Sequence, residues 1–171
     1  MGAWGAIIMG FFGAVFAAVT LGWQYHAAGL ALAAPFAIFA AIALAATHVL
    51  RLPGAGIVPS ERAGRVIMWS SIGEGVGLFI VANVVQNVHR PNLLLPAMAL
   101  VVGLHFLPIA AAAPFRPFYI VGGTLILAAI AGAVVVSPLG GAIAGFAAAA
   151  ALWFAALVAI RRDWRARILT S

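Results

Sequence analysis

The sequence predicts an all-α membrane protein, a single domain built as a bundle of six transmembrane helices with both termini in the cytoplasm. Hydrophobic residues make up 66% of its 171 residues and charged residues only 7%, whereas about a quarter of the residues of a soluble domain are charged. The mean hydropathy is +1.19. These values exclude a soluble enzyme, a disordered chain and a coiled coil. The lack of cysteine in the sequence excludes a disulfide scaffold and cysteine-ligated metal sites.

Six apolar segments are each about 20 residues long, which is the length of helix that crosses ~30 Å of hydrocarbon. Turn-forming and polar residues separate them, as the run His89-Arg90-Pro91-Asn92 does between the third and the fourth segment. A longer connection begins at Leu52-Pro53-Gly54 and ends in Glu61-Arg62. The first segment lacks a basic stretch before it and is too long for a signal peptide, so we expect a true span. The predicted spans cover residues 4–23, 29–50, 66–88, 93–113, 118–136 and 141–160.

The arginines predict the orientation of the bundle. Every basic residue is Arg, and cytoplasmic loops carry an excess of basic residues. With the N-terminus inside, only Arg90 falls in an outer loop. The frequent Ala and Gly, with Arg in place of Lys, are typical of a high-GC bacterial genome, so we expect a multi-pass protein of a bacterial inner membrane. Because the charges punctuate apolar runs instead of forming a polar patch, we expect no nucleic-acid partner. The inner arginines are Arg51, Arg62, Arg65, Arg116, Arg161, Arg162, Arg165 and Arg167.

The basic segment near the C-terminus, residues 161–167, reads Arg-Arg-Asp-Trp-Arg-Ala-Arg. We expect it to extend the last helix into the headgroup layer. There the arginines would act as a stop-transfer anchor or attract anionic lipids. Membrane lipids are therefore the first partners that the sequence predicts.

Two ionisable residues, Glu74 and His105, lie deep within the predicted spans. A charge at membrane depth costs about 3 kcal/mol or more, so such residues point to function. Glu74 is nine residues from Arg65, or ~13 Å from the inner end of its helix, and His105 is eleven residues from Arg116, or ~16 Å from that end. Both are also nearly equally far from the turn at Arg90. These counts predict that carboxylate and imidazole meet on neighbouring helices, where each favours the charged form of the other.

Further polar residues are expected at the depth of Glu74 and His105. On a helical wheel Ser70 shares the face of Glu74. Thr124 and Trp153 are each eight residues from an inner arginine and fall in the same layer. The predicted substrate or proton site consists of Glu74, His105, Thr124 and Ser70.

Small residues and a proline predict features of helix packing. Gly73 and Gly77, and likewise Gly141 and Gly145, have the spacing that lets two helices approach closely. Close packing within one chain is the first interpretation, and a homo-oligomer is the second. Pro108 removes one backbone hydrogen bond within its helix. It marks either a break that lines a cavity or a simple kink.

One motif carries a resemblance to a known group of proteins. The run Val102-Gly103-Leu104-His105-Phe106-Leu107-Pro108-Ile109-Ala110, followed by an aromatic-rich turn and Gly122, resembles a signature of small bacterial six-helix integral membrane proteins of unknown function. That signature reads V-G-L-H-F-L-P-[IL]-A. The chain also resembles that group in having an acidic residue, here Glu74, in the preceding span. The resemblance covers roughly residues 66 to 125. It implies that His105 belongs to a distinctive motif and implies no activity.

Three functions from different classes fit this sequence. The first is small-molecule or proton-linked permeation, in which Glu74 and His105 accept protons and Thr124 and Ser70 line the site. The second is a non-catalytic accessory or assembly subunit whose buried polar residues only fix packing. The third is an intramembrane enzyme that uses His105 and Glu74 as acid and base, which we rank below the other two because the chain has no known catalytic motif. We expect no cofactor and no metal, and a second copy or another membrane protein as a possible partner beside lipid.

The arginine asymmetry makes the topology testable. A reporter domain fused after Ser171 should read as cytoplasmic and a reporter inserted at Arg90 as external, because basic loops are retained inside. Location-dependent reporter activity in cells measures both positions. If both reporters read the same side, the six-span arrangement is contradicted.

Overall fold

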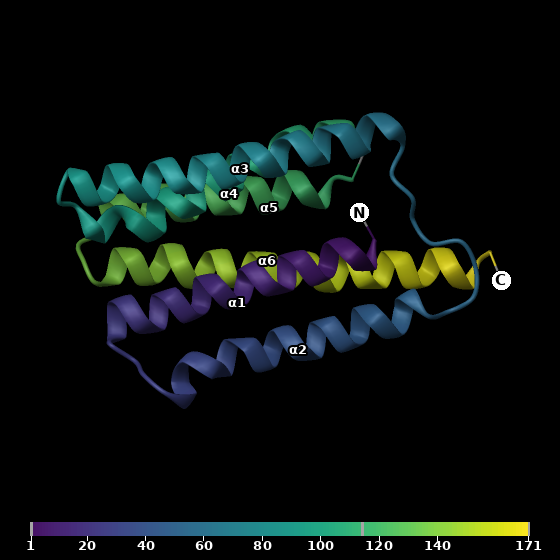
Figure 1. Ribbon diagram of the computed structural model, residues 1–171, viewed down its shortest axis with the longest axis horizontal. Coiled ribbons are helices and arrows are strands. Elements are labelled where there is room, and N and C mark those ends of the chain that lie inside the picture. Colours follow the sequence, from purple (N-terminus) through teal and green to yellow (C-terminus); the bar gives the residue numbers. More distant parts are fainter. Residues whose placement is uncertain (1, 114, 171) are drawn as a thin grey trace.

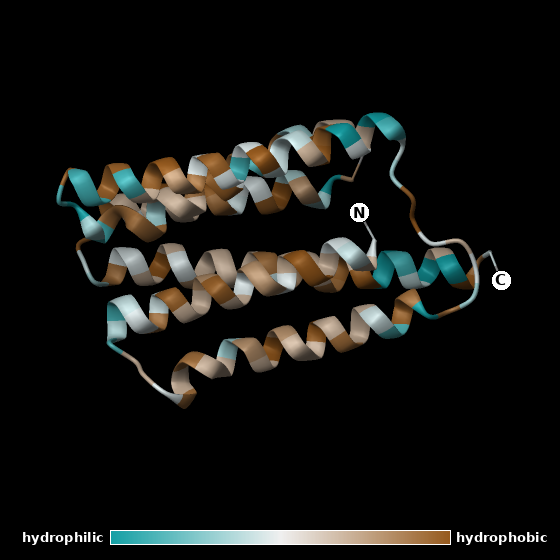
Figure 2. Ribbon diagram, viewed as in Figure 1, coloured by the Kyte–Doolittle hydropathy of each residue, from teal (hydrophilic) through white to brown (hydrophobic). Residues whose placement is uncertain are grey.

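The computed structural model describes residues 2–113 and 115–170, which form a bundle of six long helices and, within these ranges, no strand. Figure 1 shows the helices side by side, with both termini toward the same end of the bundle. Each helix is long and apolar enough to cross a membrane, and Figure 2 shows that the hydrophilic residues gather toward the two ends. The helices are α1 (Ala3–Tyr25), α2 (Leu30–Leu50), α3 (Glu61–Asn87), α4 (Leu94–Ala112, preceded by a 3-10 turn at Pro91–Leu93), α5 (Pro117–Val134) and α6 (Leu139–Ile168).

The six predicted spans are confirmed as helices, and two of the helices extend well beyond the predicted bounds. Helix α3 begins at Glu61 because the side chain of Ser60 caps it, accepting a hydrogen bond of 3.3 Å from the Ala63 N–H. The assignment of Glu61-Arg62 to the connection was therefore wrong. Helix α6 continues to Ile168, as expected for the basic C-terminal segment.

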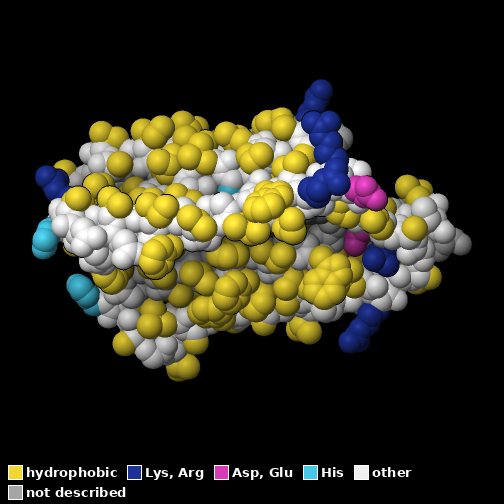
Figure 3. All heavy atoms as spheres, turned by 45° about the horizontal axis from the view of Figure 1, so that its top comes forward, with side chains coloured by type: hydrophobic (Ala, Val, Ile, Leu, Met, Phe, Trp, Pro, Cys, Tyr) yellow, Lys and Arg dark blue, Asp and Glu magenta, His cyan; other side chains and the backbone are white. Residues whose placement is uncertain are grey.

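Charge is distributed unequally between the two ends of the bundle. The end at which both termini lie, here called the Arg-rich end, also holds the α2–α3 and α4–α5 connections. Figure 3 shows basic side chains gathered mainly at one end, with hydrophobic side chains over most of the face between the ends. This distribution fits helices that present an apolar belt to lipid.

Helix α6 is the centre of the packing. It contacts α1, α2, α4 and α5, and its buried side consists almost entirely of Ala and Gly. Consecutive helices form three hairpins, α1 with α2, α3 with α4 and α5 with α6. Helices α2 and α3 lie at opposite edges: α2 packs on α1 and α6, whereas α3 packs mainly on α4 and buries only Ala63 and Val85.

Two pairs of glycines let helices approach closely. A Cβ atom on Gly145 would collide with the Thr20 hydroxyl of α1, and one on Gly141 would collide with the Gln24 amide. The prediction that this pair mediates close packing is thus confirmed, within one chain. Between α4 and α5, a Cβ on Gly103 would lie 3.0 Å from the carbonyl oxygen of Gly122.

The other predicted packing residues divide into two groups. A Cβ on Gly77 would lie 2.9 Å from Cγ1 of Val101 on α4, so its role in close packing is confirmed. Gly73 has open space in the Cβ direction, and the prediction for it was wrong because α3 packs mainly on one neighbour and turns Gly73 away from it. Pro108 is exposed on the outside of α4, which continues as a helix through this residue. It therefore contributes to neither the core packing nor the lining of a cavity.

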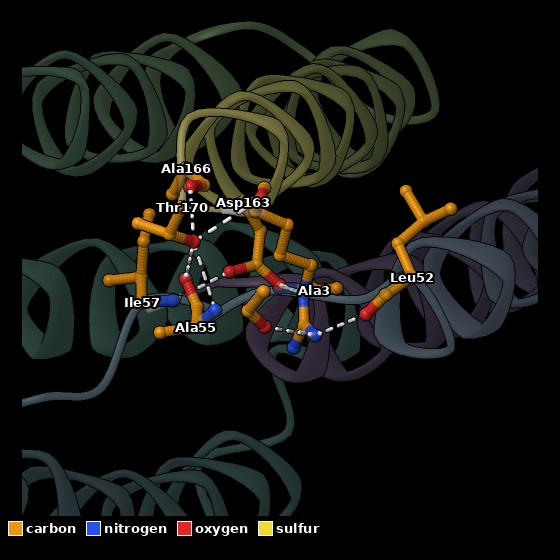
Figure 4. Close-up of polar contacts among 9 residues, drawn as sticks. Ala3, Leu52, Ala55, Ile57, Asp163, Ala166 and Thr170 are labelled. Carbon is orange, nitrogen blue, oxygen red and sulfur yellow. Dashed lines mark hydrogen bonds and ion pairs between the residues drawn. The ribbon is translucent and has the colours of Figure 1, made fainter.

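Asp163 near the end of α6 joins three segments that are distant in the sequence (Figure 4). Its side chain is 2% exposed. Oδ1 accepts a hydrogen bond of 2.7 Å from the Ile57 N–H, and Oδ2 accepts one of 3.2 Å from the Ala3 N–H. The first N–H groups of a helix have no partner within it, so Asp163 caps α1 from another helix. A Cβ on Gly2 would lie 2.7 Å from Oδ1, which explains the glycine at this position.

Arg167 and Thr170 complete this arrangement, here called the Asp163 clamp. Arg167 Nε lies 3.5 Å from Asp163 Oδ2, while its Nη1 donates to the Leu52 carbonyl oxygen at 3.1 Å. The Thr170 hydroxyl accepts a hydrogen bond of 2.9 Å from the Ala55 N–H. Gly54 has a φ of 94°, and a Cβ there would collide with the Arg167 carbonyl oxygen, so only glycine fits. The basic end of α6 thus binds the α2–α3 connection, a role that the sequence analysis missed.

The Asp163 clamp makes the stability of the bundle testable. Asp163→Ala should lower the free energy of unfolding by about 2 kcal/mol, because buried N–H groups that had bonded to a charged acceptor lose it. Asp163→Asn should cost less, since the amide oxygen still accepts one N–H. Thermal unfolding of the purified protein in detergent measures both. Arg161→Ala, an exposed position two residues away, is the matched control, and a loss of stability equal to that of Asp163→Ala would contradict the role of the clamp.

Candidate functional site

Glu74 of α3 and His105 of α4 are in contact, and both residues are partly buried. His105 Nδ1 lies 3.6 Å from Glu74 Oε2, and the side chains are only 8% and 11% exposed. The predicted meeting of the two residues is therefore confirmed. It follows from the α3–α4 hairpin, in which positions equally far from the turn at Arg90 lie opposite each other.

The carboxyl group and the imidazole are in close contact without a hydrogen bond. A separation of 3.6 Å exceeds the range of N–H···O hydrogen bonds, and His105 Nδ1 is fully buried with no hydrogen-bond partner among the described residues. The pair is neutral when it holds one proton, either as carboxylate with imidazolium or as carboxylic acid with imidazole. Without that proton it carries a single negative charge. The arrangement can thus hold, release or exchange one proton inside the bundle.

The Glu74–His105 pair lies on the wall of a cavity of about 280 Å³, here called the Glu74 cavity. Side chains from α1, α3, α4 and α6 line it. Apart from the pair and the Ser71 hydroxyl, the lining side chains are apolar. They include Met9, Phe12, Leu78, Val102, Phe106 and Leu152.

The cavity exists because α1 and α3 face each other without close packing. Helix α3 packs mainly on α4, and α1 packs on α2 and α6. The facing sides of α1 and α3 carry Gly5 and Gly75 on the cavity wall, and a Cβ on Gly75 would meet open space. Because glycine has no side chain, these two positions leave room between α1 and α3 at the depth of Glu74.

A second cavity of about 400 Å³ lies next to the first, toward the Arg-rich end. The two share Gly5, Ile8 and Ile67 in their walls. The second cavity is also lined by Pro59 of the α2–α3 connection and by the Asp163 clamp. The two cavities therefore lie one after the other along α1, between the clamp and the Glu74–His105 pair.

Of the two neighbouring serines, Ser71 lines the cavity and Ser70 does not. Successive helical residues are 100° apart, which places Ser70 on the side of α3 that bears Gly77 and faces α4. The cavity lies on the other side of Glu74, with Ser71 and Leu78. The prediction for Ser70 was wrong because the helical wheel gave the face of Glu74 without showing which side of it α4 covers.

Thr124 does not join the site. It is exposed and lies in a hollow on the outside of α5 and α6, beside Phe154. Its neighbours Val121 and Leu125 take the buried positions of α5, which turns Thr124 outward. The prediction that Thr124 lines the Glu74 site was therefore wrong.

Trp153 also has a different role from the one expected. Its Nε1 donates a hydrogen bond of 3.2 Å to the Gly10 carbonyl oxygen, and its ring lies where a Cβ on Gly13 would be. Trp153 thus fastens α6 to α1 and is not part of the lining of the Glu74 cavity. The aromatic residues that do line it, Phe12 and Phe106, were not included in the predicted site.

A double-mutant cycle tests the energetic coupling of the pair. Glu74→Gln and His105→Gln should each lower the thermal stability of the protein in detergent, because the remaining partner stays buried without its charge complement. The double mutant should lose less than the sum of the single losses. Polar pairs inside membrane proteins couple by about 0.6 kcal/mol on average and by up to about 1.7 kcal/mol, so we expect about 1 kcal/mol here.

Asn83 supplies the control for this cycle. It lies on α3 as Glu74 does, but its side-chain amide donates a hydrogen bond of 2.8 Å to the Phe79 carbonyl oxygen of its own helix. Asn83→Ala combined with His105→Gln should therefore be additive. Strict additivity for Glu74 and His105 as well would show that the two side chains do not interact.

Comparison with protein-family models, with curated proteins and with solved structures found no match for this chain. The resemblance of its fourth helix to a signature of small bacterial membrane proteins stays a prediction.

Proposed function

We propose that this protein binds a small molecule in the Glu74 cavity and moves it across the membrane in a cycle linked to the proton held by Glu74 and His105. The observation that carries this proposal is the position of the pair on the wall of a cavity. A pair that serves packing alone needs no open space beside it. Here the carboxylate and the imidazole both border a space that a ligand can occupy.

The energetics of the membrane interior support a functional role for the pair. A charged residue at this depth costs about 3 kcal/mol or more relative to an apolar one, and residues retained there commonly form proton relays and substrate sites. The neighbouring apolar walls exclude ordinary solvation of the pair. Binding or release of a ligand next to it therefore changes the relative free energies of its protonated and deprotonated forms.

The second cavity supports a route to the pair from the Arg-rich end. It lies next to the Glu74 cavity along α1 and borders the α2–α3 connection. We infer from the arginine distribution that this end lies in the cytoplasm of a bacterial cell, with the six helices in the inner membrane. A ligand would then reach the Glu74 cavity from the cytoplasm or laterally from the lipid between α1 and α3.

A second candidate function is that of an accessory subunit in a membrane complex. Helix α3 favours it, because it packs mainly on α4 and leaves large apolar side chains such as Trp69, Val76 and Phe79 exposed. A helix of a second copy or of another membrane protein would fit this face as lipid does. In this case the Glu74–His105 pair only fixes the α3–α4 hairpin and no compound is moved.

Flux into vesicles tests the proposed function. The purified full chain is reconstituted into liposomes that contain a pH-sensitive dye, and three classes of small compounds are added outside: quaternary ammonium ions, carboxylates and neutral amides. We expect one class to change the internal pH severalfold faster than in empty liposomes, because the ligand and the proton share one site. Glu74→Gln should abolish the difference.

Thr124→Ala is the matched control for this measurement. Thr124 lies outside the Glu74 cavity, so its loss should leave the flux unchanged. No pH change with any class of compound, in vesicles that contain folded protein, would contradict permeation and favour the accessory role.

A further inference from the structure

We infer that the ligand of the Glu74 cavity is a monovalent lipophilic cation that exchanges one for one with the proton of the Glu74–His105 pair. This inference rests on the proposed function and assigns its substrate class. It follows from the charge balance of the cavity, from the chemistry of its walls and from its size.

The charge balance is simple because few ionisable groups face the pair. Helix α1 has none before Tyr25 at the far end, and α6 has none between Leu139 and Ile160. The only ionisable residue of α4 is His105 itself. On α3 the nearest is Arg65, nine residues away, or ~13 Å along the helix. Among the described residues, the lining of the cavity contains no arginine, so no fixed positive charge there offsets the Glu74 carboxylate.

This balance sets what can bind when the proton leaves. The deprotonated pair carries one negative charge in apolar surroundings, and an uncompensated buried charge is strongly unfavourable. A bound monocation restores neutrality as the proton does. An anion would add a second negative charge, and a neutral molecule would leave the first one uncompensated. The proton and a monocation therefore compete for the same carboxylate.

The walls of the cavity favour an organic cation over a metal ion. Oxygen-seeking cations require about six oxygen ligands, whereas the lining side chains supply only the Glu74 carboxylate and the Ser71 hydroxyl. Phe12 and Phe106 are among the residues that line the cavity, and aromatic side chains attract organic ammonium groups. The remaining lining side chains are apolar and would surround the hydrocarbon part of such a cation.

The size of the cavity limits the ligand to a small molecule. Pockets for drug-sized ligands enclose about 300–1,000 Å³, and the Glu74 cavity, at about 280 Å³, is just below this range. An ammonium group with a single aromatic ring or a short alkyl chain is of the appropriate size. Benzyltrimethylammonium is such a probe, and neopentylbenzene is its uncharged isostere of the same shape.

Calorimetric titration of the purified full chain in detergent tests this inference. Benzyltrimethylammonium should bind and release about one proton, which titrations at one pH in two buffers with different ionisation enthalpies would count. Its apparent Kd should rise about tenfold for each pH unit of acidification once the free pair is protonated. Neopentylbenzene should bind at least tenfold more weakly and release no proton.

Two variants complete the test. The Glu74→Gln variant should not bind benzyltrimethylammonium and should release no proton when that cation is added. Phe12→Leu keeps the Glu74–His105 pair. It should lower the affinity for benzyltrimethylammonium severalfold and change the affinity for neopentylbenzene little. This variant remains informative if Glu74→Gln fails to fold. Equal binding of the two probes, or cation binding without proton release, would overturn the inference. Vesicle flux of carboxylates or amides without flux of quaternary ammonium ions would overturn it as well and leave the proposed function intact.

Discussion

The close packing of α1 against α6 is the constraint on which the rest of the bundle depends. Gly141 and Gly145 bring the two helices together, Trp153 joins them by a hydrogen bond to Gly10, and Asp163 caps the first turn of α1. In a membrane, van der Waals packing and hydrogen bonds replace the hydrophobic effect as the force between helices. A seam of small residues is therefore the strongest connection available, and it makes α1 and α6 the rigid centre around which the other helices are arranged.

The Glu74 cavity is a consequence of this arrangement. Because α1 is held by α6 and α3 is held by α4, the two helices that face each other across the cavity belong to different parts of the bundle. The cavity volume depends on the distance between them, and no close contact fixes that distance. Helix α4 is itself packed closely on α5, where a Cβ on Gly103 would lie 3.0 Å from the Gly122 carbonyl oxygen. The wall that α3 contributes is therefore the least constrained side of the cavity.

Hydropathy and residue counts predicted the helices and the Glu74–His105 contact, because both depend only on position along the chain. The sequence alone was insufficient where lateral placement decides the outcome. Thr124 and His105 have nearly the same depth, yet one faces outward and the other inward. These helices are apolar on every side, so their amphipathic pattern is too weak to show which face is buried.

The role of Asp163 was hidden for a related reason, since its partners are backbone N–H groups, which have no signature in the sequence. The pairing of Asp163 with Arg167, four residues later, was the one available signal.

The Asp163 clamp also bears on how the protein is made. Its hydrogen bond to the Ala3 N–H joins residues 160 positions apart in the chain. The first helix therefore enters the membrane with its leading turn uncapped, and it acquires its cap only after α6 has been synthesised. The same event fixes the α2–α3 connection, because the Ile57 N–H donates to the same carboxylate. A nascent chain that has not yet reached Asp163 can pack α1 on α2, but it lacks the carboxylate that joins the start of α1 to α6.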